Sequence, residues 1–124
     1  MGSESFDRLH ERERDRRRRE AKEAAQRRLI GKAERIAGAT IERIASEYRP
    51  KEIYQTGSLL DPNRFSEISD IDIAVSGLTP EEIEEISDWT ADESAFPVDI
   101  IDLDRAEQVY RKEIYEKGRR VFPQ

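Results

Sequence analysis

The pattern of apolar and polar positions changes at Leu29. Residues 7–28 contain no proline or glycine and consist mainly of Glu, Arg, Lys, Ala and Gln, which are strong helix formers. From Leu29 onward apolar residues recur at spacings of three and four, which predicts one face of an amphipathic helix. The members of this face are Leu29, Ala33, Ile36, Ala37, Thr40, Ile41, Ile44 and Tyr48. Pro50 should end the helix, because the residue before a proline is pushed out of the helical conformation.

Short runs with strand character follow. Residues 51–56 are predicted to form the first strand, with Ile53 and Gln55 pointing inward. Residues 71–75 alternate with the period of a strand. One face then carries Ile71, Ile73 and Val75, and the other carries Asp70, Asp72 and Ala74. Residues 98–103 should form a third strand, and Val121-Phe122 a short edge strand.

Two further helices are predicted between and after these strands. Thr79 is the expected cap of the first one, with Pro80 at its first position and Glu82 completing a capping box. Its inner face should hold Ile83, Ile86 and either Trp89 or Thr90, and residues 91–96 should be loop. Asp104 should cap the last helix, with Glu107 at the box position and Gly118 as its stop. The apolar stripe of the last helix is predicted to be Ala106, Val109, Tyr110 and Ile114.

This order of elements predicts an α/β (α+β) fold. It has a small mixed sheet of three or four strands with flanking helices, preceded by a long charged N-terminal helix. We expect two parts: residues 1–28 as a charged helical extension and residues 29–124 as one domain. In the extension, pairs such as Glu13 with Arg17 have the favourable i, i+4 order. The extension is either a solvated helix or an arm that binds nucleic acid or a partner.

The candidate chemistry lies between the first two strands. Gly57-Ser58 is followed, after eleven residues, by Asp70-Ile71-Asp72. Two carboxylates on one strand face lie roughly 6–7 Å apart along the chain. They repel each other and raise each other's pKa unless a cation lies between them, and Mg²⁺ suits such a pair. Glycine allows a triphosphate to approach the backbone, and Ser58 adds a hydroxyl donor and can cap a following helix.

This combination resembles the signature of the DNA polymerase β-like nucleotidyltransferases, and of their minimal nucleotidyltransferase (MNT) group in particular. That signature is Gly-Ser, a spacer of about ten residues, Asp-x-Asp, and a third carboxylate on a later strand. The resemblance implies the nucleotidyltransferase fold and a nucleotide site at Gly57, Ser58 and Ser69. It also implies catalysis and binding of two Mg²⁺ ions by Asp70, Asp72 and Asp99, with ATP or another NTP as substrate.

Two details of the resemblance are open. Asp99 and Asp102 are three residues apart, so a strand sends them to opposite faces, and only one can join Asp70 and Asp72. The family's acid opens the strand, which favours Asp99 over Asp102. Many MNT proteins also have an arginine and a second glycine just after Gly-Ser, where this chain has Leu59, Leu60 and Asp61; Arg64 is the candidate replacement.

Composition narrows the classes of function. The chain has no cysteine and one histidine, His10, which exclude a thiolate zinc site, a disulfide framework and a multi-histidine metal site. Residues 1–30 carry ten Arg/Lys against seven Asp/Glu, whereas residues 31–124 carry twelve against twenty-one. An acidic domain is a poor binder of nucleic-acid backbone, so a polynucleotide is expected only at the basic N-terminal arm. With no apolar run of membrane-spanning length, we expect a cytoplasmic protein.

Two functions from different classes fit these residues. The resemblance implies a Mg²⁺-dependent transfer of AMP from ATP to a hydroxyl on a partner protein. Stand-alone MNT proteins often pair with a HEPN-type toxin and act as its antitoxin, so a HEPN-type toxin is the expected partner. The alternative is a binding module of the same fold that neutralises its partner by contact, with weak or no catalysis.

Overall fold

The computed structural model describes residues 2–124, with side chains from Phe6 onward; Met1 lies outside the described residues. A 47-residue helix, α1 (Gly2–Tyr48), comes first. The elements that follow are β1 (Glu52–Thr56), a one-turn 3₁₀ helix η1 (Ser58–Leu60), β2 (Ile71–Ser76), α2 (Pro80–Glu93), β3 (Val98–Asp102), α3 (Gln108–Lys117) and β4 (Arg119–Phe122).

The four strands form one mixed sheet in the order β3-β2-β1-β4. β1 pairs antiparallel with both β2 and β4, and β2 pairs parallel with β3 through the crossover helix α2. Parallel neighbours need a long crossover of this kind, whereas antiparallel ones do not. The predicted α+β fold with a small mixed sheet and flanking helices is therefore confirmed, as is the long N-terminal helix.

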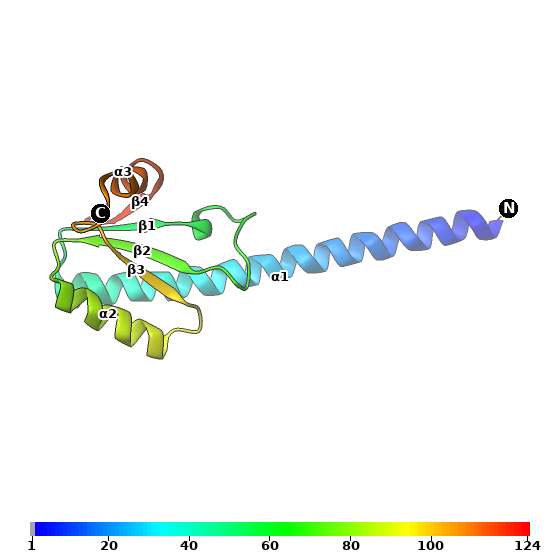
Figure 1. Ribbon diagram of the computed structural model, residues 1–124. Helices are drawn as coiled ribbons and strands as arrows, with labels where there is room; N and C mark the ends of the chain where they lie inside the picture. The colour runs from blue at the N-terminus through cyan, green and yellow to red at the C-terminus, as the bar shows by residue number, and fades with distance from the viewer. Residues whose placement is uncertain (1) are drawn as a thin grey trace.

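The helices lie on both faces of the sheet: α1 and α2 on one, α3 on the other (Figure 1). The face toward α1 and α2 holds the larger apolar core, in which Ile53, Ile71, Ile73 and Val75 are fully buried beside Ala33, Ala37 and Ile44 of α1. The face toward α3 holds a smaller cluster of Ala74, Ile101, Leu103 and Ile114, packed against Tyr54. Because alternate residues of a strand point to opposite faces, Asp72 lies on the α3 face.

The start of α2 follows the expected chemistry. The Thr79 hydroxyl accepts a hydrogen bond from the Glu82 backbone N–H at 3.1 Å, and the Glu82 carboxylate accepts one from the Thr79 N–H at 3.0 Å. Together with Pro80 in the first turn, this capping box fixes where the crossover begins. Trp89 of α2 packs against the larger core and donates to the Tyr48 hydroxyl at 3.3 Å, so it belongs to the core.

Three local predictions are wrong. Residues 91–93 continue α2, because Ala, Asp and Glu tolerate the helix and the Ser94 N–H bonds the Thr90 carbonyl. Asp104 does not cap α3, which begins at Gln108; its carboxylate accepts the Gly77 N–H at 2.7 Å instead. Val109 is 81% exposed, because buried Ile114 sets the packed face of α3 and Val109 lies on its opposite side.

The first half of α1 extends away from the sheet as a helix continuous with its packed half (Figure 1). Gln26 is the first residue of α1 that forms a hydrogen bond to the rest of the domain. Its side-chain amide donates to the carbonyls of Pro62 and Phe65, at 2.9 and 2.6 Å. Gln26 lies inside the predicted extension of residues 1–28, so the boundary at residue 29 stays a prediction. No helix within residues 2–124 is long and apolar enough to cross a membrane.

The Gln26 contact gives a direct test of that boundary. A chain starting at Leu29 should melt several degrees below one starting at Ala21, because it alone loses two hydrogen bonds, worth about 1–2 kcal/mol. Thermal denaturation followed by circular dichroism measures the difference, and both chains lack the exposed arm. Equal melting temperatures would place the boundary at residue 29 as first predicted.

Candidate functional site

The parallel pairing of β2 with β3 brings two of the predicted carboxylates together. In this register Asp72 lies opposite Asp99, and the pairing of β1 with β2 puts Thr56 on the other side of Asp72. Paired residues of adjacent strands point to the same face, with the strands about 4.8 Å apart. Asp72 is half-buried and Asp99 is exposed. Asp70, two residues before Asp72, is exposed just before β2 begins.

Burial and like charge act together on Asp72. Burial is the larger cause, followed by the charges of Asp99 and Asp70, and they raise the pKa of the Asp72 carboxyl from 3.8 to about 6. The same neighbours affect Tyr110 of α3, whose pKa is raised by burial and then by the charges of Asp72 and Asp99. A bound cation would remove this repulsion, so the donor set fits a hard divalent ion such as Mg²⁺.

Gly57 lies directly against the Asp72 carboxylate. Its φ is +82°, a conformation that L side chains rarely adopt. A Cβ at this position would overlap the Asp72 carboxylate oxygen Oδ2 and lie 2.9 Å from Cγ. Both the backbone and the neighbouring acid therefore require glycine here.

Two serines, Ser58 and Ser69, flank the loop between Gly57 and Asp70. Ser58 begins only the single turn of η1, in which no side chain caps the helix, so no longer helix follows Ser58. Ser69 uses its hydroxyl inside the loop, where it accepts the Ser66 N–H at 2.9 Å. Ser69 is not among the residues that line the cavity described next.

A cavity of about 380 Å³ lies in front of Asp72. One wall comes from the predicted segment: Thr56, Gly57, Ser58, Leu60, Arg64 and Asp72. The other wall is one face of α3, made of Tyr110, Glu113, Ile114 and Lys117. Glu113 and Lys117 were not predicted as site residues, and Tyr110 was predicted only as part of the apolar stripe of the last helix. The spacing 110, 113, 114, 117, which is typical of one helix face, was the available signal. A larger groove between α1 and β4 holds none of the predicted site residues.

Asp102 lies away from this cavity. It is on the α1–α2 face at the end of β3, and its Oδ2 forms a 2.7 Å ion pair with Arg105. Because α3 begins only at Gln108, Asp102 does not lie at the N-terminus of that helix. Its other oxygen, Oδ1, is buried without a hydrogen-bond partner.

The carboxylates do not by themselves form a closed metal cage. Among the described residues, no group of three or more Asp, Glu or His side chains is arranged to hold a metal ion. Mg²⁺ typically keeps water ligands and binds through one or two carboxylates plus substrate phosphates. The Asp72–Asp99 pair matches that mode of binding rather than a site made by protein alone.

Comparison with known proteins agrees with this geometry. Residues 39–124 match the family described as "Polymerase beta, Nucleotidyltransferase". The matched range contains all four strands, α2 and α3. The chain belongs to this family. The resemblance first read from Gly57-Ser58 and Asp70-x-Asp72 is thereby confirmed. A comparison with curated proteins found no match.

Solved structures give the same fold. The toxin–antitoxin MntA-HepT crystal structure has 22% identity to this chain, a TM-score of 0.56, and a match covering 73% of each chain. A toxin–antitoxin crystal structure with AMP-PNP has 26% identity and a TM-score of 0.57, covering 69% of this chain and 73% of the other. This nucleotidyltransferase-fold domain is therefore similar to a protein of a toxin–antitoxin pair.

The raised pKa of Asp72 makes its effect on stability depend on pH. The folded chain holds this proton more tightly than the unfolded chain, so Asp72 increasingly destabilises the fold as the pH rises from about 4 to about 6. Asp72→Asn should raise the free energy of unfolding by about 1 kcal/mol at pH 8, less than the full shift because the carboxyl is half exposed. At pH 4 the gain should be absent.

Urea denaturation at both pH values measures this gain, and Asp88→Asn, an exposed acid of α2, is the matched control. An equal gain for Asp72→Asn at pH 4 and pH 8 would contradict the assignment.

Proposed function

We propose that this nucleotidyltransferase transfers AMP from ATP to a hydroxyl on a partner protein, in a Mg²⁺-dependent reaction, as the antitoxin of a HEPN/MNT toxin–antitoxin pair. The observation that carries the proposal is the pairing of Asp72 with Asp99 beside Gly57, where the Asp72 carboxylate leaves no room for a side chain. The similarity to toxin–antitoxin structures, one of them with AMP-PNP, supports the partner and the nucleotide.

The chain's residues take the following roles in the proposal. The Gly57 turn admits the triphosphate, the Ser58 hydroxyl donates to a phosphate oxygen, and Ser69 holds the loop that leads to Asp70. Arg64 and Lys117 add positive charge to the cavity, which lacks the arginine that follows Gly-Ser in many MNT proteins. Asp70, Asp72 and Asp99 would hold two Mg²⁺ ions, which when bound neutralise the triphosphate and lower the pKa of the attacking hydroxyl.

The reaction exchanges the phosphoanhydride bond between the α- and β-phosphates of ATP for a phosphate ester bond to the acceptor. The acceptor oxygen forms a bond to the α-phosphorus while the bond from that phosphorus to the bridging oxygen breaks, and pyrophosphate leaves. Asp99 is the exposed acid of the pair and accepts the acceptor's proton in this proposal.

The second candidate function is that of a non-catalytic binding module with the same fold. The described residues contain no group of three metal-binding side chains, and Gly57-Ser58 is followed by Leu59 and Leu60. Both features fit a module that binds the same partner and neutralises it by contact.

Nucleotide binding separates the two candidates. Calorimetric titration with ATP should show binding in the presence of Mg²⁺ and little without it, because the paired acids repel the triphosphate when no cation is present. Asp72→Asn should weaken Mg²⁺–ATP binding at least about tenfold. No binding by the natural chain would favour the contact-only module.

Transfer identifies which third acid is used. Asp99→Ala should reduce AMP transfer to the partner by orders of magnitude with little change in melting temperature. Asp102→Ala should retain most transfer and lower the melting temperature modestly, because it breaks the ion pair with Arg105. Mass spectrometry of a HEPN-type partner co-expressed with each variant reports the added AMP. The reverse pattern would assign the site to Asp70, Asp72 and Asp102.

A further inference from the structure

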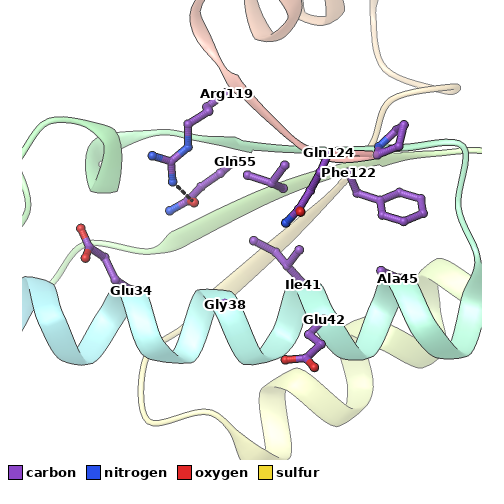
Figure 2. A pocket seen from close by; sticks show the side chains of 11 residues that line it. Glu34, Gly38, Ile41, Glu42, Ala45, Gln55, Arg119, Phe122 and Gln124 are labelled. Atoms are coloured by element: carbon purple, nitrogen blue, oxygen red, sulfur yellow. Dashed lines mark hydrogen bonds between the residues drawn. The ribbon is translucent and has the colours of Figure 1, made fainter.

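A groove larger than the Asp72 cavity lies between α1 and the edge strand β4, and Asp70, Asp72 and Asp99 are not among its lining residues. It encloses about 810 Å³. Its α1 wall includes Glu34, Gly38, Ile41 and Ala45, and its sheet wall includes Gln55, Arg119, Val121 and Phe122. Figure 2 shows Glu34 and Ile41 pointing from α1 toward the sheet, with Gly38 between them, and Arg119 bonded to Gln55. The groove is thus a partly apolar channel beside a helix.

Gly38 leaves this wall of α1 without a side chain. It lies inside a long helix, where glycine is less favourable than alanine. A Cβ added at Gly38 would meet no described atom within 4 Å, so packing within the chain does not require a glycine. Glu34, one turn earlier, forms no ion pair with any described residue.

The exposed arm of α1 carries the complementary features. Phe6 and Leu9 are 59% and 62% exposed and are the large apolar residues of the arm. Arg16 has only two long, exposed ion pairs, to Glu13 at 3.7 Å and Glu20 at 3.9 Å. Such pairs contribute little and are readily exchanged.

The arm and the groove wall lie on the same face of one helix. Residues separated by a whole number of turns lie on the same side of a helix. At 3.6 residues per turn, Leu9 and Ala45 are about ten full turns apart, and Arg16 and Glu34 are about five full turns apart. Leu9 and Ile41 are about 48 Å apart along this continuous helix. The arm therefore cannot fold back into its own groove, and only the arm of another copy can reach it.

We propose that this groove receives the N-terminal arm of a second copy of the chain, in a reciprocal antiparallel dimer. A two-fold axis near Ala25 brings together residues whose numbers sum to 50. It places Leu9 opposite Ile41, Arg16 opposite Glu34, and Glu23 opposite Arg27 of the other copy. Each apolar or charged pair occurs twice, as an isologous interface requires.

The same axis places the exposed Phe6 within one residue of the level of Ala45 and Glu13 within one residue of the level of Gly38, where the missing side chain leaves room. The arm has no continuous apolar stripe that packs on its own domain. In the dimer, the apolar residues of the arm pack against the groove of the other copy. The inference does not depend on the proposed nucleotidyl transfer.

Charge exchange in the full chain tests the pairing. Sedimentation velocity across the micromolar range should show a monomer–dimer equilibrium. Arg16→Glu should weaken the dimer about tenfold or more, because it sets like charges together at two places. The double variant Arg16→Glu/Glu34→Arg should restore dimerisation. Arg18→Glu, the same change on the opposite side of the helix, is the control and should have little effect.

A monomer at every concentration would overturn the proposal. Equal weakening by Arg16→Glu and Arg18→Glu, or no recovery in the double variant, would also overturn it. Gly38→Trp provides a second measurement, because a Cβ at this position meets no described atom within 4 Å and the indole ring would occupy the groove. It should keep the melting transition of the natural chain and abolish the dimer; a Gly38→Trp chain that folds and still dimerises would refute the groove as the interface.

Discussion

Repulsion between two carboxylates on neighbouring parallel strands is the constraint on which this molecule depends. In a different register of β2 and β3, Asp72 and Asp99 would not lie opposite each other. The observed register pairs them directly. The fold holds them there through the apolar residues on the reverse side of β2, Ile71, Ile73 and Val75, which are fully buried. The free energy of that buried core offsets the electrostatic cost, since shifting the register by one residue would expose it.

The two faces of the sheet are therefore used differently. The α1–α2 face provides stability, and its crossover helix is fixed at the start by the Thr79–Glu82 capping box. The α3 face is thinly covered, since α3 has ten residues and only Ile114 is buried in it. This thin cover leaves a cavity between α3 and the Gly57 turn, and α3 furnishes Lys117 and Tyr110 to that cavity.

The sequence predicted those parts of the fold that follow from local pattern. The alternation over residues 71–75, the capping box and Pro50 each define an element within a few neighbours, and the structure confirms these elements. The second wall of the cavity was missed because Tyr110 and Lys117 reach Gly57 only through tertiary packing of α3. Val109 was misplaced for a related reason: the helix starts later than Asp104, and Ile114 alone fixes which face packs. The acids and Gly57-Ser58 were found through the family's spacing, and their roles in catalysis remain proposals.

The continuity of α1 also determines how the chain moves in solution. A compact protein of this length has a radius of gyration of about 14 Å, whereas a 47-residue helix is about 70 Å long. A small domain carrying so long a rod experiences more friction than a sphere of equal mass. Its elution volume in gel filtration will therefore correspond to a much larger globular standard, even for a single chain. Mass has to be taken from light scattering or from the ratio of sedimentation to diffusion, since apparent size alone makes one copy of this chain resemble two.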